Sequence, residues 1–277
     1  MPSLGSLLKL LWQVLSGVFQ YRRAMKGVDA LSRQSQRRDA VIQAFTRGDY
    51  RGGLLLTEEL RDKGKPTADY WFYRGAFLLE LGTDDAQAEE SLRNCIPMQE
   101  SPQLKALTLS TLALVLIRRE RYDEAQRCIE DALLCWPGKG SFFRDLAEIS
   151  LRRGDNPSVA LELASKGVEA ESHAGSSEPG VAHLNLAENL ATLGWAIAAA
   201  RGQASEVEQR VDRALRNLDA AVVQSCSQVH YHAGLAFSIL GDREKSQRQL
   251  RSAISFDAQG RAGRDAKALL ETLACHQ

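Results

Sequence analysis

The sequence predicts an all-α fold, built as a right-handed solenoid of about six stacked helix pairs. Residues 109–137, LSTLALVLIRRERYDEAQRCIEDALLCWP, show two amphipathic segments joined by a tight turn and ended by a proline. This pattern returns about every 34 residues, which is typical of a helix-pair repeat. Strand signals are nearly absent, because the chain has no long alternating run rich in Val, Ile and Thr.

Short loops with glycine mark the inner turns of most pairs. Gly48 and Gly82 are 34 residues apart, as are the turn at Glu120 and Gly154. Glycine suits the end of a helix because it adopts positive φ without steric cost. The predicted pairs span residues 29–60, 69–97, 109–137, 141–168, 181–218 and 227–257, and a shorter helix over 264–273 is expected to cap the open end.

Small and large residues alternate at matching places in these pairs. The third pair has Ala113, Ala125 and Ala132 between large apolar residues, and the sixth has Gly234 and Ala253 in the same roles. These residues resemble the tetratricopeptide repeat family from about residue 29 to the C-terminus. The resemblance implies a binding solenoid over 29–277, preceded by a separate segment over 1–28.

Charge and cysteine content narrow the class of protein. The 35 basic and 35 acidic side chains cancel, which argues against a general nucleic-acid binder. Residues 1–38 are an exception, with seven basic side chains against Asp29 alone. The five cysteines are odd in number and lack CxxC spacing, so we expect reduced thiols and a cytoplasmic protein.

The segment Leu4–Tyr21 is apolar around most of a helix and is followed by a basic cluster. As a helix it would be about 27 Å long, slightly short of a ~30 Å hydrocarbon core. Three interpretations stay open: it lies on the inner face of a membrane as a peripheral anchor, it packs on the solenoid or in its groove, or it mediates self-association. The membrane-interface residues would be Leu7, Leu8, Leu11, Trp12, Leu15, Phe19, Arg22 and Arg23.

No motif for catalysis, a cofactor or a metal stands out. His230 and His232 are two residues apart and would point in different directions on a helix. Cys226 and His230 would supply two ligands, whereas a structural zinc site needs four. We therefore expect no enzyme activity. An enzyme would need a catalytic pocket that the sequence does not show, and only an activity abolished by a point change at His230 or Glu148, with folding intact, would support one.

In repeats that this chain resembles, the first helix of each pair lines a concave face. We expect a largely apolar groove there that binds a protein or peptide partner. A chaperone-tail carboxylate is not expected, because no asparagine stands at the corresponding positions. The predicted groove residues are Phe72, Ala76, Leu79, Ser110, Leu114, Ile117, Arg144, Glu148, Leu151, Trp195, Tyr231 and Leu235.

Two functions follow from these features. The first is a non-catalytic interaction scaffold or adaptor, tethered to a membrane surface by its N-terminal helix. The alternative is a soluble accessory or chaperone-like subunit of an enzyme or secretion complex, in which that helix is structural. The sequence identifies neither the partner nor the biological process.

Overall fold

The computed structural model describes residues 35–62, 64–173, 179–218 and 222–275. All regular elements within these ranges are helices, so the all-α prediction is confirmed. The predicted N-terminal helix over 1–28 lies outside the described residues. None of the described helices is long and apolar enough to cross a membrane.

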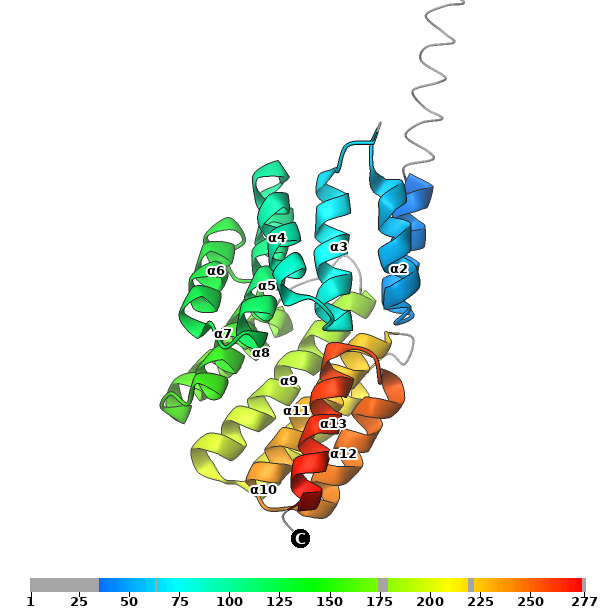
Figure 1. The fold of residues 1–277 in the computed structure, drawn as a ribbon. Coiled ribbons are helices and arrows are strands. Elements are labelled where there is room, and N and C mark those ends of the chain that lie inside the picture. The colour runs from blue at the N-terminus through cyan, green and yellow to red at the C-terminus, as the bar shows by residue number, and fades with distance from the viewer. Residues whose placement is uncertain (1–34, 63, 174–178, 219–221, 276–277) are drawn as a thin grey trace, which may run out of the picture.

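The helices form antiparallel pairs that follow one another along the chain (Figure 1). Their bounds agree with the predicted pairs to within a few residues at most ends. In chain order the pairs are residues 35–46 with α2 (Tyr50–Leu56) and the 3-10 turn η1 (Thr57–Leu60), α3 (Ala68–Leu81) with α4 (Asp85–Cys95), α5 (Pro102–Arg118) with α6 (Tyr122–Cys135), α7 (Gly140–Arg153) with α8 (Pro157–His173), α9 (Pro179–Arg201) with α10 (Ala204–Arg216), and α11 (Val223–Ile239) with α12 (Arg243–Phe256), followed by α13 (Arg261–Cys275).

The predicted turns end the first helices as expected. Gly82 and Gly154 cap α3 and α7 with φ of 63° and 79°, values that favour glycine over residues with a Cβ. Side chains then start the next helices: Asp84 accepts a hydrogen bond from the amide of Gln87 at 2.9 Å, and Asp242 from that of Lys245 at 3.0 Å. Glycine residues at the ends of first helices and acidic N-caps at the starts of second helices therefore set the spacing of the pairs.

Helices within a pair approach most closely at a repeated small residue. A Cβ added to Gly75 on α3 would lie 2.6 Å from Leu92 Cγ on α4, and one added to Gly234 on α11 would lie 2.6 Å from Leu250 Cδ2 on α12. At Gly194 on α9 the nearest atom, Val211 Cγ2, is 3.6 Å away, which is an ordinary contact. The same repeat position is thus tight in the second and sixth pairs and loose in the fifth.

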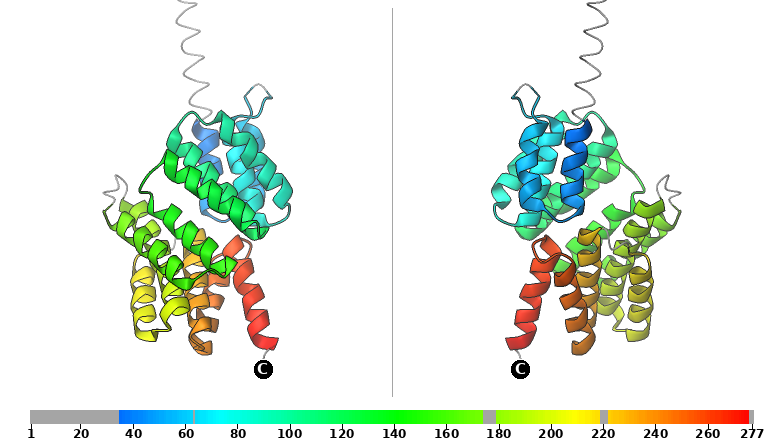
Figure 2. Two further views of the ribbon diagram at one scale, coloured as in Figure 1. Left: turned by 90° about the vertical axis from the view of Figure 1, so that its left-hand side faces the viewer. Right: turned by 90° about the vertical axis from the view of Figure 1, so that its right-hand side faces the viewer.

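The stack bends so that its C-terminal end returns to its N-terminal half. Figure 2 shows α2–α6 as one group and α7–α13 as a second, with α13 beginning where the two groups meet. There Glu80, at the end of α3, accepts a hydrogen bond from Gln224 Nε2 at 2.6 Å and another from the backbone amide of Arg261 at 2.8 Å. The Tyr50 hydroxyl also donates to Asp257. The ends of the solenoid therefore touch.

Substitution of glycine at the repeated small position should change stability differently in tightly and loosely packed pairs. We expect Gly234→Ala to lower the free energy of unfolding by about 1–3 kcal/mol, because the new methyl group overlaps Leu250. Gly194→Ala should instead be neutral or raise it by up to about 1 kcal/mol, since alanine favours helix and space exists. Urea unfolding followed by circular dichroism measures both; equal effects at the two positions would contradict this packing.

Candidate functional site

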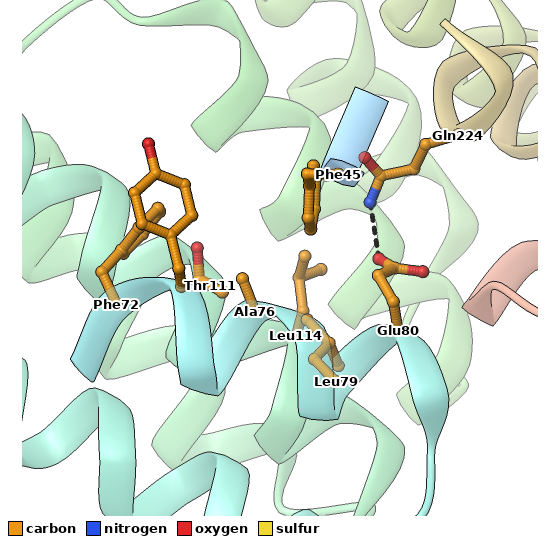
Figure 3. A pocket seen from close by; sticks show the side chains of 9 residues that line it. Phe45, Phe72, Ala76, Leu79, Glu80, Thr111, Leu114 and Gln224 are labelled. Carbon is orange, nitrogen blue, oxygen red and sulfur yellow. Dashed lines mark hydrogen bonds between the residues drawn. The ribbon is translucent and has the colours of Figure 1, made fainter. Parts of the chain in front are cut away.

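An apolar pocket of about 200 Å³ lies between the first helices of the first three pairs. Phe72, Ala76 and Leu79 of α3 form one side, and Thr111 and Leu114 of α5 form the other (Figure 3). Phe45 and Tyr73 complete the lining. Glu80 and Gln224 close the end opposite Phe72. We call this space the apolar pocket.

Helical periodicity explains why these side chains share a surface. Positions 72, 76 and 79 follow i, i+4 and i+7 spacing, which places them on one face of α3. Positions 104, 107, 111 and 114 likewise fall on one face of α5. Leu104 and Leu107 are 41% and 37% exposed, and Ile42 on the first helix is 39% exposed. We call the pocket together with Leu104 and Leu107 the apolar strip.

The polar end of the pocket is satisfied within the chain. Each carboxylate oxygen of Glu80 accepts a hydrogen bond, one from Gln224 and one from Arg261, and the side chain is buried. Glu80 and Gln224 therefore serve as a wall, and the chemistry that the remaining surface offers is apolar contact.

The predicted groove residues of the fourth pair lie in a buried ionic cluster. Arg144 contacts Asp145, with 2.9 Å between Nη2 and Oδ1, and also pairs with Glu188. Ser110 Oγ donates to Asp145 Oδ2 at 2.7 Å. Burial raises the pKa of Asp145 despite the nearby arginine, so its negative charge depends on these partners.

Glu148 is the centre of a second buried cluster. Its carboxylate accepts a hydrogen bond from Arg152 Nε at 2.8 Å and lies 3.6 Å from Arg261 Nη1. Although burial alone would raise the pKa of Glu148, Arg152 and Arg261 hold it below its ordinary value. Trp195 and Tyr231 flank the Arg152 guanidinium, with ring centroids 5.9 and 6.0 Å away.

His232 belongs to this cluster and is uncharged. Its Nδ1 lies 2.9 Å from Thr192 Oγ1, which itself donates to a backbone carbonyl, so Nδ1 carries the proton. Its Nε2 then accepts from Gln228 Nε2 at 2.7 Å, and Gln228 Oε1 accepts from Arg261. Burial lowers the pKa of His232 to about 3. The network joins α9, α11 and α13 around a neutral ring.

The structure thus divides the predicted groove residues into two sets. Phe72, Ala76, Leu79 and Leu114 line the apolar pocket, and Ile117 lies beside it in a smaller polar pocket that Leu114 also lines. The others are buried or packed against neighbouring helices, around the two ionic clusters or in the apolar core between them: Ser110, Arg144, Glu148, Leu151, Trp195, Tyr231 and Leu235.

Five pocket residues were missed by the sequence reasoning: Phe45, Tyr73, Glu80, Thr111 and Gln224. Phe45 lies three residues after Ile42 on the same helical face, and Tyr73 and Thr111 are each one residue from a predicted position, so a corrected helical register would have found them. Gln224 comes from the sixth pair, and nothing in its local sequence indicates that it reaches α3.

His230 and Glu148 do not share a site. His230 Nδ1 lies 2.6 Å from Gln249 Oε1, and its ring stacks on Phe256 with centroids 5.4 Å apart. Glu148 instead lies 3.7 Å from His232. Among the residues that the structure describes, no three His, Cys, Asp or Glu side chains converge as metal ligands would.

Similarity to known proteins identifies the fold of this chain but no partner. No protein-family model matches the sequence, and no curated protein is similar to it. Solved structures of similar fold include YrrB, a TPR protein with an unusual peptide-binding site (18% identity, 73% of this chain and 92% of that chain covered, TM-score 0.38). PilF of Pseudomonas aeruginosa (16%, 85% and 98%, 0.45) and MamA (15%, 66% and 91%, 0.44) are others.

Likenesses at this level concern the arrangement of helices alone. The pairs themselves have a tetratricopeptide-type architecture, as the sequence predicts, with small residues where the helices cross and glycine at inner turns.

The buried neutral His232 should make stability depend on pH. The unfolded chain binds a proton at its ordinary pKa of 6.5, whereas the folded chain does so only near 3. The free energy of unfolding should therefore fall as pH decreases below about 6.5, by up to about 1.4 kcal/mol per pH unit.

Urea unfolding at about pH 7, 6 and 5 measures this slope. His232→Gln should flatten it, because the titrating group is gone. The matched control is His230→Gln, on the same helix but outside the network, which should keep most of the slope. An unchanged slope in His232→Gln would show that the ring is not the group responsible.

Proposed function

We propose that this protein is a non-catalytic interaction scaffold that binds an apolar segment of a partner protein along the apolar strip. The observation that carries the proposal is the apolar pocket, whose α5 residues share one helical face with the exposed side chains Leu104 and Leu107. Contiguous exposed apolar surface is uncommon on soluble proteins and marks binding sites.

The dimensions of the strip favour an amphipathic helix as the partner. From Leu104 to Leu114 the α5 face extends about 15 Å, which matches about three turns of a bound helix. The pocket volume suits a large aliphatic or aromatic anchor, whose burial contributes about 1.5–3 kcal/mol. Two or three such anchors at i, i+3 or i+4, and i+7 spacing would give specific binding.

The N-terminal segment extends the proposal to a membrane surface. Residues 4–21 and the basic cluster after them lie outside the described residues, so support comes from the sequence alone. Their apolar face and the adjacent Arg22 and Arg23 match helices that lie in the interface of anionic membranes. On this proposal the scaffold works in the cytoplasm, at the inner face of a membrane.

Peptide binding tests the apolar strip. We expect helical peptides selected from a displayed library against the full chain to carry apolar anchors at helical spacing. Leu114→Glu should weaken their binding at least about tenfold, because a charge would enter the apolar pocket. Leu134→Glu, at an 81% exposed position on α6, is the matched control and should change nothing. Equal loss in both variants, or none in either, would refute the strip as the binding surface.

Liposome flotation tests the membrane part separately. The full chain should float with anionic vesicles and stay in solution with neutral ones, because the arginines bind acidic headgroups. Arg22→Glu combined with Arg23→Glu should abolish flotation, whereas Arg51→Glu together with Arg47→Glu, at exposed positions in the first pair, should not. Flotation that survives the first pair of substitutions would contradict the proposed anchor.

A further inference from the structure

The described chain begins, at residue 35, at the end of the apolar strip where Leu104 lies. The first helix runs parallel to α3. Arg38 hydrogen-bonds with Tyr73 and lies near Asp69 at the start of α3, while Phe45 packs edge-on against Phe77 further along it, at 5.5 Å between centroids. In Figure 3, Phe72 and Thr111 lie at one end of the pocket and Leu79 at the other. Residue 35 and the exposed Leu104 are therefore at the same end.

We propose that residues 4–21 dock into the apolar strip of their own chain when no partner occupies it. This inference rests on the proposed function of the strip as a seat for an amphipathic helix. Residues 4–21 would then occupy the strip first, and any partner would have to displace them.

The length of the connecting chain permits this docking. Residues 22–34 can extend to about 43 Å at full stretch. Phe45, which lines the pocket, is ten residues from position 35, or about 15 Å along the helix. A tether that exceeds the required distance by this margin lets the segment reach every part of the strip.

The segment also fits the strip in chemistry and spacing. Leu8, Leu11, Leu15 and Phe19 follow i, i+3, i+7 and i+11 spacing and fall on one helical face. Positions 104, 107, 111 and 114 of α5 have nearly the same spacing. Two helices with matching apolar ridges can pack along their length. With its charges paired inside the chain, the strip needs no polar partner.

The free edge of the first pair is a poorer seat for this segment. On α2 and η1 the exposed side chains include Arg51, Glu58 and Glu59, and Leu55 is the single large apolar side chain exposed there, at 76%. A polar edge is already suited to solvent and needs no apolar cover. The apolar strip is therefore the surface that docking would bury.

Tethering makes even weak docking effective. A short flexible linker gives an effective concentration on the order of millimolar, so contacts too weak to bind between molecules can hold within one. The apparent affinity of a partner is then lower than its affinity for an empty strip. It is reduced by the fraction of chains in which the strip is open. The N-terminal segment would thus set the threshold for partner binding.

Photo-crosslinking in the full chain tests this inference. Trp12 is replaced by photoreactive benzoylphenylalanine, and the products formed without lipid are mapped by mass spectrometry. We expect cross-links within one chain to residues 69–79 and 104–114. Leu114→Glu should reduce their yield about tenfold, as should Thr111→Lys, which leaves the core intact; Leu134→Glu should not. Cross-links to the outer helices, or between two chains, would overturn the inference.

A competition measurement separates this inference from the proposed function. A library-selected peptide should bind about tenfold more tightly to the chain carrying Leu8→Glu and Leu11→Glu, because the strip is then open. Unchanged affinity, with binding still sensitive to Leu114→Glu, would refute self-docking and leave the strip as a partner site. Loss of peptide binding in every variant, with cross-links to the strip intact, would support self-docking and refute the partner site.

Discussion

The buried carboxylate of Glu80 is the constraint on which the shape of this molecule depends. It stands at the end of α3 and accepts hydrogen bonds from Gln224 and from the backbone of Arg261, which lie 144 and 181 residues further along the chain. A buried carboxylate without partners would cost several kcal/mol. The last pair and α13 must therefore lie against the second pair. This contact gives the apolar pocket its end wall at Glu80 and Gln224.

The two halves of the solenoid use their first helices differently. In the first three pairs the inner surface is apolar and partly open, so it can accept a ligand. In the last three it is filled by Glu148, Arg152, His232 and their partners. Such a network is strong only if every member is satisfied, because unpaired charges in a low dielectric are costly. The C-terminal half therefore holds a buried polar network, and the N-terminal half carries the surface proposed for binding.

The sequence predicts most of the fold because the fold is local. Gly82 and Gly154 end their helices because of their own backbone preference, whatever lies around them. Ala113 and Gly234 permit close helix crossings through contacts with the partner helix of the same pair. The pocket was predicted in part for the same reason, since Phe72, Ala76 and Leu79 follow from the period of one helix. Gln224 was not, because it reaches Glu80 across the bend, and the role of His232 was missed because it depends on Thr192 of the preceding pair. The bend depends on how successive pairs are oriented relative to one another, which no residue pattern within a single pair encodes.

Closure through Glu80 changes how the chain should fold. In an open array each repeat touches only its neighbours, so the ends fray first and folding can spread from any point. Here Tyr50 and Asp257, far apart in sequence, are held together, and the terminal pairs protect each other. Contacts of such long sequence separation raise the contact order and slow folding, because the loop must close before they form. The closed solenoid therefore gains a cooperative unfolding transition and loses the rapid, stepwise assembly of an open one.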